Sequence, residues 1–341
     1  MTDIIGEVAR MTLAEKRELA DALRCAIAEE LAARGSAEPE RCPRCGCPEF
    51  VRKGRDASGS QRWLCGGCAR TFGARTMGLL GRSKLPAGKW MEFAACMADA
   101  LPLRETARRV GVSLYTAWYM RMRVCQVMSS KLLAPRGEVF EVDGTFFPRS
   151  LPGNHSRSRW HSLGRDPHRS GHDRPGRGKR DHVCVICGVS ELGDAFCQLA
   201  DGSEDSPSVA VCVMALPEGC TVATDGWAGY SAGWALGGRG HEVRDGRRLP
   251  SVNALHSRLK AFAAGFRGLS VRRLQRYLDW FCWIEQHRRH EGDRRELLYM
   301  HEASGTYACV RKVIHLEDWP FMSCWNRSSI GYRYGYMSMV V

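Results

Sequence analysis

The stretch EVFEVDGTFFPRS, residues 138–150, decides the fold prediction because it joins the pattern of a strand to a carboxylate. Val139, Phe140 and Val142 are apolar and strand-forming, and Glu141 lies among them. We expect the strand to end at Asp143, since Asp is disfavoured inside a half-buried strand. Asp143 then either begins a turn or supplies a negative charge that a site at the strand end requires.

The chain that follows continues as short strands and then helices. Strands are predicted at 182–190, 194–200 and 220–225, and helices near 206–215 and at 251–265 and 270–290. Three strands, a helix, a strand and then helices predict an α/β layer fold.

The part of the chain before residue 138 has the periodicity of helices. Thr12 and Glu15 have capping-box spacing, and apolar residues then recur at helical intervals through 12–33. Residues 87–130 are expected to be helical throughout, with one interruption at 111–113.

Composition narrows the class of protein. The 341 residues are enough for two or three domains, and no apolar run is long enough to span a bilayer. The N-terminus lacks the pattern of a secretory signal, so we expect an intracellular protein with no membrane partner.

A net charge of +13 indicates a polyanionic partner, most often nucleic acid. Sixteen cysteines in an intracellular chain indicate metal ligation or burial before disulfides.

Two cysteine pairs predict a structural zinc site. Cys42 and Cys45 form one C-x2-C pair, and Cys65 and Cys68 form another after nineteen intervening residues. Four thiolates in two tight knuckles suit tetrahedral Zn²⁺, and the polar turn between two predicted strands is typical of a zinc ribbon. Cys47 is a spare thiol beside the first pair and an alternative ligand.

A further C-x2-C, Cys184 and Cys187, is interpreted differently because it lies inside an apolar strand. Side chains three residues apart in a strand point to opposite faces, so the two thiols cannot chelate one ion. We expect both in the core.

Residues 103–124, LRETARRVGVSLYTAWYMRMRV, have the pattern of a helix-turn-helix. Gly111 allows the turn and Ser113 can cap the second helix. An ordinary helical hairpin is the alternative, but the basic charge and the neighbouring zinc module favour DNA binding. The residues expected to contact DNA are Arg104 and Arg108 on the first helix and Tyr115, Thr116, Tyr119 and Arg121 on the second.

A basic segment interrupts the α/β pattern at 154–181, with eight Lys or Arg, four His and three Asp. It has no apolar periodicity, so we expect a mobile loop. The segment is either a solvated insertion or a contact with a phosphate backbone. We favour the contact, with Arg177, Lys179 and Arg180 as its basic residues.

Asp225 ends the predicted strand 220–225 as Asp143 ends the first one. Two such carboxylates are hard oxygen ligands of the kind that bind Mg²⁺. The helix predicted at 251–265 adds Asn253 and Lys260, which are seven residues apart and therefore share a face, with His256 close to that face.

The order of these motifs resembles an insertion-sequence transposase of the DDE superfamily, in the group with an N-terminal zinc ribbon and an Asp-Asp-Asn-Lys set. The matching segments are EVDGTFF, TDGWAGY and VNALHSRLK, followed by the helix LQRYLDWFCW at 274–283. The resemblance covers roughly residues 40–290 and departs from the group in the composition of the basic loop and in residues 291–341.

The resemblance implies a ribonuclease-H-like catalytic domain that cleaves and transfers DNA strands at terminal inverted repeats. Asp143 and Asp225 would hold Mg²⁺ or Mn²⁺, with Asn253 as a neutral third oxygen ligand. Lys260 would hold a phosphate near the scissile bond. His256 is an alternative third ligand, a DNA contact or a satisfied, partly buried histidine.

The resemblance also implies partners and a location. They are transposon-end and target DNA, a homodimer or higher oligomer on DNA, and a cytoplasmic, nucleoid-associated place in a prokaryote. Two other functions stay open: a transposase-derived DNA-binding protein without catalysis, and an unrelated zinc-ribbon nuclease or RNA-processing enzyme.

The predicted architecture is multidomain α/β, a ribonuclease-H-like domain preceded by a zinc ribbon and a helix-turn-helix domain. The predicted domains are a helical segment (1–36), the zinc ribbon (37–80), the helix-turn-helix domain (81–133), the catalytic domain (134–290, with the basic loop at 150–181) and a C-terminal tail (291–341).

Overall fold

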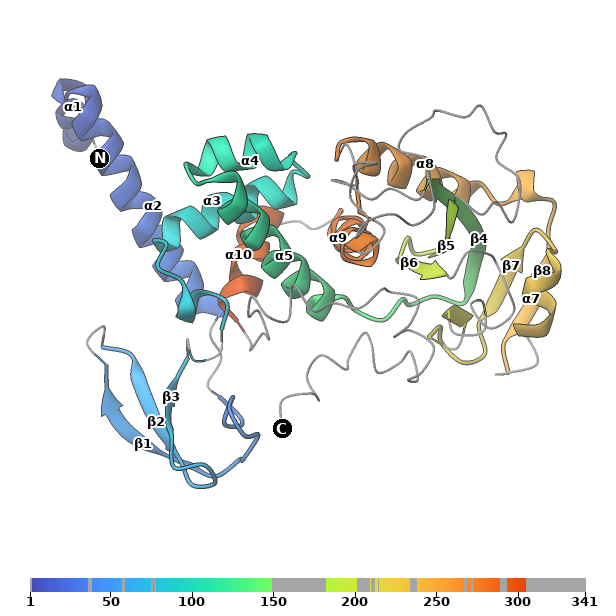
Figure 1. Cartoon of the computed structure of the whole chain (residues 1–341), viewed down its shortest axis with the longest axis horizontal. Helices are drawn as coiled ribbons and strands as arrows, with labels where there is room; N and C mark the ends of the chain where they lie inside the picture. Colours follow the sequence, from blue (N-terminus) through green and yellow to red (C-terminus); the bar gives the residue numbers. More distant parts are fainter. Residues whose placement is uncertain are drawn as a thin grey trace, which may run out of the picture. The chain divides into compact units, whose positions relative to one another are not determined.

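A computed structural model gives the fold, and the chain in it divides into two compact units (Figure 1). The structure describes residues 2–35, 39–56, 59–74, 76, 78–148, 182–200, 209, 212–213, 215–233, 238–266, 269–270, 273–288 and 293–304. Of these, residues up to 127 and those from 293 to 304 belong to the first unit, and residues from 128 to 288 belong to the second. The two units are described separately. No helix in the described part of the chain combines the length and the apolar character needed to cross a bilayer.

A small antiparallel sheet lies in the first unit. Its strands are β1 (Phe50–Arg55), β2 (Gln61–Cys65) and β3 (Thr71–Gly73), in that order. Trp63 and Phe72 stack with their ring centroids 5.8 Å apart and form most of its apolar core together with buried cysteines. The predicted pair of strands is therefore present, and a third strand completes the sheet.

The rest of the first unit is helical. Its helices are α1 (Thr2–Arg10), α2 (Leu13–Gly35), η1 (Leu80–Arg82), α3 (Ala87–Ala98), α4 (Leu103–Val110), α5 (Leu114–Lys131, which continues into the second unit) and α10 (Arg294–Ala303). The predicted capping box precedes α2. The backbone N–H of Thr12 donates to Oε2 of Glu15 at 2.7 Å, and the N–H of Glu15 donates to the Thr12 hydroxyl at 3.3 Å.

The helices between 87 and 130 are interrupted twice, whereas the sequence pattern predicts one break. The unpredicted break follows α3, where Ala100 adopts φ 55° and Leu101 N–H donates to the carbonyl of Cys96 at 3.0 Å. Pro102 then precedes α4, and a proline is tolerated there because its missing N–H would have no partner at a helix start.

The second unit contains a five-stranded mixed sheet of order β6-β5-β4-β7-β8. The strands are β4 (Val139–Pro148), β5 (His182–Ser190), β6 (Ala195–Ala200), β7 (Thr221–Thr224) and β8 (Gly240–Val243). The strands β4, β5 and β6 are antiparallel neighbours, while β4, β7 and β8 run parallel. Helices α7 (Ala228–Gly233), η3 (Gly246–Arg248), α8 (Pro250–Ala264) and α9 (Leu274–Gln286) complete the described unit.

The sheet has an apolar cluster on each face. One cluster joins the sheet to α8 and α9 and contains Cys187. The other contains Phe140, Val142 and Cys184 and packs against residues beyond β6 and against Tyr230. Cys184 and Cys187 are fully buried on opposite faces, which confirms the prediction that they are core residues and do not form a metal pair.

The sheet differs from the prediction in two respects. β4 does not end at Asp143 but continues to residue 148, because β5 pairs with it from Ser190 to His182. β8 was not predicted, since its sequence GHEV has too few apolar residues to give a strand pattern. The helix predicted at 206–215 falls mostly outside the described residues.

Candidate functional site

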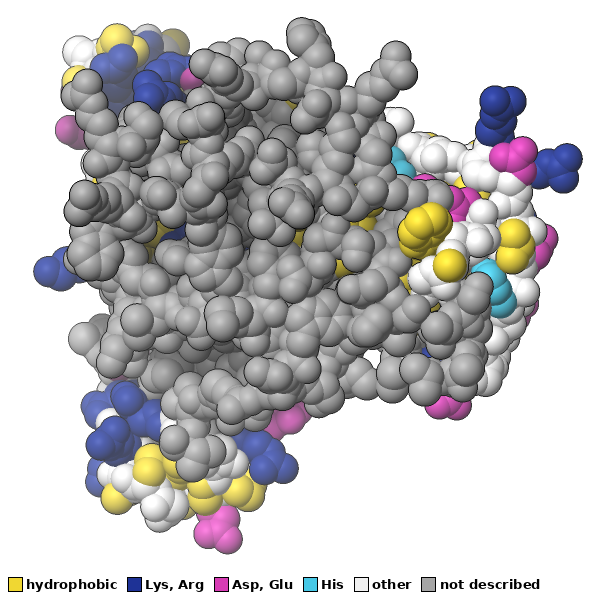
Figure 2. Space-filling model, turned by 45° about the vertical axis from the view of Figure 1, so that its right-hand side comes forward, with side chains coloured by type: hydrophobic (Ala, Val, Ile, Leu, Met, Phe, Trp, Pro, Cys, Tyr) yellow, Lys and Arg dark blue, Asp and Glu magenta, His cyan; other side chains and the backbone are white. Residues whose placement is uncertain are grey.

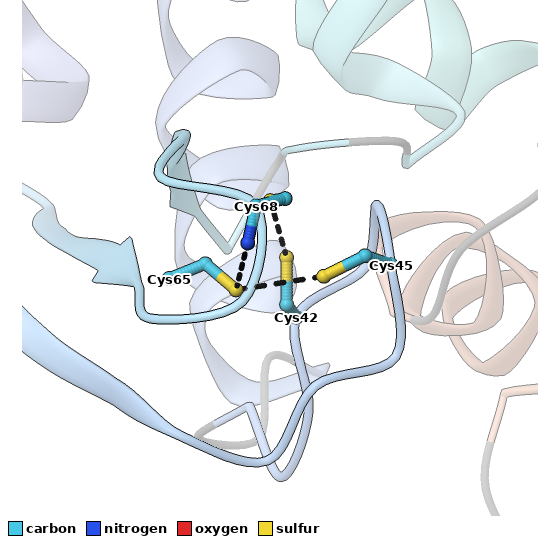
Figure 3. Close-up of side chains that lie close together, drawn as sticks. All are labelled: Cys42, Cys45, Cys65 and Cys68. Carbon is cyan, nitrogen blue, oxygen red and sulfur yellow. Dashed lines mark hydrogen bonds between the residues drawn. The ribbon is translucent and has the colours of Figure 1, made fainter.

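Four cysteines of the small sheet converge on one point (Figure 3). Cys42 and Cys45 come from the loop before β1, Cys65 ends β2, and Cys68 lies in the turn that follows. Their sulfur atoms all lie within 4.8 Å of one another, with Cys42 and Cys68 3.8 Å apart and Cys45 and Cys65 3.5 Å apart. Tetrahedral Zn²⁺ with bonds near 2.3 Å needs sulfur separations of about 3.8 Å. The four thiols therefore fit a zinc ion.

The second knuckle is shaped to stabilise a thiolate. The backbone N–H of Cys68 points at Sγ of Cys65 at 3.5 Å, and this contact is the main reason that the pKa of Cys65 is lowered. A lowered pKa favours the thiolate form that binds metal. Cys47 lies outside the four-sulfur cluster, with its thiol directed at the carbonyl oxygen of Glu49 at 3.7 Å.

The predicted turn joins helices α4 and α5. Gly111 ends α4 with φ 66°, a left-handed conformation that favours glycine. Ser113 caps α5 by accepting the N–H of Thr116 at 3.1 Å, and the two hydroxyls lie 2.9 Å apart. Both local predictions are confirmed, and the hydroxyl of Thr116 is engaged in the cap.

The structure corrects the prediction for Arg121. This side chain is 1% exposed, and its Nη2 donates to the carbonyl of Leu101 at 2.6 Å and contacts the Thr106 hydroxyl at 3.3 Å. A guanidinium held inside the helical unit cannot reach a base edge. Arg121 fastens α5 to the start of α4, and we no longer expect it to contact DNA.

The remaining predicted DNA contacts of this helix pair differ in exposure. Arg104 is exposed, and Tyr115 is 56% exposed. Arg108 is exposed and paired with Glu105 in the same helix, at 3.1 Å from Nε. Tyr119 is half-buried, with its hydroxyl 3.2 Å from that of Tyr115. Arg177, Lys179 and Arg180 of the basic loop lie outside the described residues.

Basic side chains gather at the lower left of Figure 2 (dark blue), where Figure 1 shows the small sheet that contains β1. Arg52, Lys53 and Arg55 are all exposed on this edge strand, and Arg62 is exposed on β2. The cysteine spacing gives no indication of this surface, although its signal, RKGR at 52–55, is present in the sequence.

One candidate carboxylate of the second unit lies in β4, and the other directly follows β7, the parallel neighbour of β4. Glu141 of β4 pairs with Ala223 of β7, an offset of 82 residues (223 minus 141), and the same offset relates Asp143 to Asp225. The pairing of β4 with β7 ends at Glu141 and Ala223, so Asp143 and Asp225 each lie two residues beyond the last pair, at the same end of the two strands. Asp143 is half-buried inside β4, and Asp225 directly follows β7.

Asn253 of α8 is tied to the neighbourhood of Asp225. Its Nδ2 donates to the carbonyl of Gly246 at 3.0 Å. Gly246 packs beside Asp225, since a Cβ placed on this glycine would lie 3.7 Å from the Cβ of Asp225. Asn253 and Lys260 are both exposed on α8. The amide nitrogen of Asn253 is thus engaged, and its oxygen is the atom suited to a metal.

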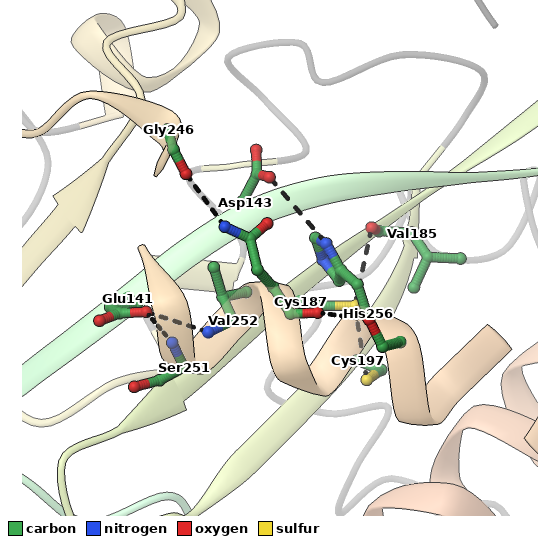
Figure 4. A network of polar contacts seen from close by, with 11 residues as sticks. Glu141, Asp143, Val185, Cys187, Cys197, Gly246, Ser251, Val252 and His256 are labelled. Carbon is green, nitrogen blue, oxygen red and sulfur yellow. Dashed lines mark hydrogen bonds and ion pairs between the residues drawn. The ribbon is translucent and has the colours of Figure 1, made fainter. Parts of the chain in front are cut away.

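His256 of α8 faces Asp143 (Figure 4). Its Nδ1 lies 4.0 Å from Oδ2 of Asp143, and the residue is 7% exposed. Burial and, to a smaller extent, the charge of Lys260 lower the pKa of His256, and the contact with Asp143 acts in the opposite direction, so the pKa is about 4. The imidazole is therefore neutral at neutral pH, and its buried Nε2 has no hydrogen-bond partner among the described residues.

Glu141 has a role that the sequence did not reveal. Its Oε2 accepts the backbone N–H groups of Ser251 at 2.8 Å and Val252 at 3.0 Å, at the start of α8 (Figure 4). The carboxylate therefore joins β4 to the helix that carries Asn253 and His256.

The acidic residues do not close into a group as tight as the four cysteines. Among the described residues, the four cysteines form the only group of at least three His, Cys, Asp or Glu ligand atoms that all lie within 4.8 Å of one another. The donor types near Asp143 and Asp225, two carboxylates and an amide oxygen, are those that Mg²⁺ prefers. A scan against protein-family models and a search of curated proteins find no match to this chain.

Proposed function

We propose that the protein is a DNA transposase that cleaves and joins DNA strands in a metal-dependent reaction. The observation that carries this proposal is that Asp143 lies in β4 and Asp225 directly follows β7, the parallel neighbour of β4, with Asn253 tied beside Asp225. The ribonuclease-H-like interpretation requires two acidic strands that are neighbours in one sheet, and β4 and β7 are neighbours.

The residues present suit the binding of a divalent cation by oxygen. Asp143, Asp225 and Asn253 would hold Mg²⁺ or Mn²⁺, which when bound would activate the attacking oxygen and stabilise the leaving oxygen of a phosphodiester. Asn253 is neutral, so this set carries one negative charge fewer than three carboxylates. Lys260, exposed one further turn along α8 from His256, would hold a phosphate of the DNA as a point charge.

Binding of DNA is proposed for the first unit. The four-cysteine cluster would hold Zn²⁺ and so shape the small sheet, whose β1 presents three basic side chains. The exposed Arg104 and Tyr115 of the helix pair are the residues best placed to contact a duplex. A net charge of +13 supports a polyanionic partner, which we take to be transposon-end and target DNA.

The test is cleavage of duplexes taken from the DNA that flanks the gene. The wild-type protein should nick or cut these duplexes with Mg²⁺ or Mn²⁺ and should lose the activity in EDTA. Preference for a terminal inverted repeat over a scrambled duplex separates a transposase from an unrelated nuclease. Sequence-specific binding without cleavage, under any divalent ion, would reject the proposal and favour a DNA-binding protein that has lost catalysis.

A further inference from the structure

We propose that Glu141 is a positioning residue that holds α8, and with it Asn253, in place relative to Asp143. The proposal rests on the proposed function for its catalytic consequence. Its structural part stands on the contacts of Glu141 alone.

Helix α8 begins without a capping side chain of its own. Leu249 occupies the N-cap position with an apolar side chain, and Pro250 follows at the first helical position. Proline has no N–H, so the first unsatisfied donors of the helix are those of Ser251 and Val252. Both donate to the same oxygen of Glu141, which comes from β4, 110 residues earlier in the chain.

The carboxylate of Glu141 brings a negative charge to the start of α8 as well as a hydrogen-bond acceptor. A carboxylate at a helix N-terminus interacts favourably with the helix dipole in addition to accepting hydrogen bonds from the backbone. Glu141 is therefore a stronger link than a neutral cap, and it connects two elements that sequence proximity does not hold together.

The link lies directly beside the proposed metal ligands. Asp143 follows Glu141 by two residues in β4, so both side chains are on the face of the sheet that α8 covers (Figure 4). Asn253 follows Val252 in α8. One clamp thus fixes the strand that carries Asp143 to the helix turn that carries Asn253, and a shift of about 1 Å between such groups can lower a rate on the order of 100-fold.

Glu141 could instead be a metal ligand, and two substitutions separate these roles. Glu141→Gln keeps an oxygen that can accept the N–H groups of Ser251 and Val252 but loses the charge. Glu141→Ala removes the acceptor. A positioning residue tolerates Gln better than Ala, whereas a carboxylate ligand of Mg²⁺ fails with either. Glu242→Ala is the matched control, because Glu242 lies in the same cross-strand row, paired with Ala223, and is about half exposed.

The experiment measures kcat and KM for DNA cleavage together with amide hydrogen exchange over residues 250–257. Glu141→Ala should lower kcat on the order of 100-fold with KM for DNA unchanged. In Glu141→Ala the amides of residues 251 and 252 should exchange faster than in the wild type. Glu141→Gln should keep most of the wild-type kcat and most of the protection of these two amides. Glu242→Ala should match the wild type in both measurements.

Two results would overturn the inference. One is a Glu141→Gln protein as inactive as Asp143→Asn, which would make Glu141 a ligand. The other is a Glu141→Ala protein with wild-type exchange at 251 and 252, which would remove the clamp. A wild-type protein that does not cleave DNA would count against the proposed function instead, and the exchange comparison would still decide whether Glu141 holds α8.

Discussion

Two carboxylates on one face of β4 have different surroundings. Glu141 accepts two backbone N–H groups of α8, so its charge is stabilised within the protein. Asp143 is half-buried and faces a neutral imidazole at 4.0 Å. The charge of Glu141 thus meets a helix N-terminus, whereas the imidazole that faces Asp143 carries no charge at neutral pH.

The buried His256 makes the stability of the second unit depend on pH. Its pKa is lowered from 6.5 to about 4 by burial, so the unfolded chain binds a proton in this range that the folded chain does not. Stability should therefore fall as the pH is lowered from 6.5 to 4, by up to about 3 kcal/mol from this residue. Above pH 6.5 His256 is neutral in both the folded and the unfolded protein, so its contribution to stability does not change with pH.

Urea unfolding at several pH values, with wild type and His256→Asn compared, measures this contribution. The variant should show a shallower loss of stability between pH 6.5 and 4. Parallel curves for the two proteins over this interval would contradict the assignment.

Two arginines of the helix pair should behave in opposite ways. Arg121→Ala removes a buried donor to Leu101 and Thr106 and should destabilise the first unit by about 1–3 kcal/mol. Arg104→Ala changes an exposed side chain and should leave melting unchanged while weakening DNA binding. Melting curves and a binding titration on each variant decide this. An Arg121→Ala protein that is as stable as the wild type but binds DNA more weakly would show that Arg121 contacts DNA.

Among the elements, the small sheet of β1, β2 and β3 should depend on the Zn²⁺ that its four cysteines are proposed to hold. Its apolar core is small, with Trp63 and Phe72 as its large members, so four metal bonds would be a large part of its stability. Cys65→Ser should abolish zinc binding, unfold the ribbon and weaken DNA binding, while the second unit keeps its fold.

Cys47→Ser is the matched control for this prediction, because Cys47 is a neighbouring thiol outside the cluster. Zinc content, amide hydrogen exchange over the small sheet and binding of transposon-end DNA are the measurements. Full end binding by a zinc-free Cys65→Ser protein would contradict the structural role of the metal.

Helix α10 carries a buried carboxyl that should reduce stability. Glu302 is fully buried, its two oxygens have no hydrogen-bond partner among the described residues, and burial raises its pKa well above 4.5. The free energy of unfolding should therefore fall as the pH rises from 4.5 through the raised pKa of the folded state, because the buried carboxyl then loses its proton. Glu302→Met should stabilise the first unit by about 1–3 kcal/mol at pH 8.

The exposed Glu296 of the same helix provides the control for Glu302. Glu296→Met should bring no comparable gain in a thermal melt. Loss of stability in Glu302→Met at pH 8 would show that the carboxyl has a favourable partner after all.

At the scale of the whole molecule, local signals were readable from the sequence and distant contacts were not. The cysteine spacing, the capping box at Thr12 and the opposite faces of Cys184 and Cys187 follow from rules that act over a few residues. The cap that Glu141 gives to α8 spans 110 residues. The burial of Arg121 depends on α4, and no periodicity in α5 predicts it.

The return of the chain to its first unit was also unpredictable. α10 packs against α2 and α3, although α2 ends at Gly35, α3 ends at Ala98 and α10 begins only at Arg294. The predicted tail at 291–341 therefore begins with an element of the N-terminal unit. Tertiary contacts of this kind leave no mark in a local pattern, because either partner alone has the composition of an ordinary amphipathic helix.

The most direct test of the account is the effect of removing one charge from either candidate metal ligand. Asp143→Asn and Asp225→Asn should each abolish Mg²⁺-dependent cleavage of an end duplex. Neither should lower the melting temperature in metal-free buffer, since two nearby carboxylates repel each other without a cation. Asp194→Asn is the control, a half-buried carboxylate of the same unit that pairs with Arg136. Cleavage retained by both site variants, or a large drop in their metal-free melting temperature, would contradict the claim that these two residues form a catalytic metal site.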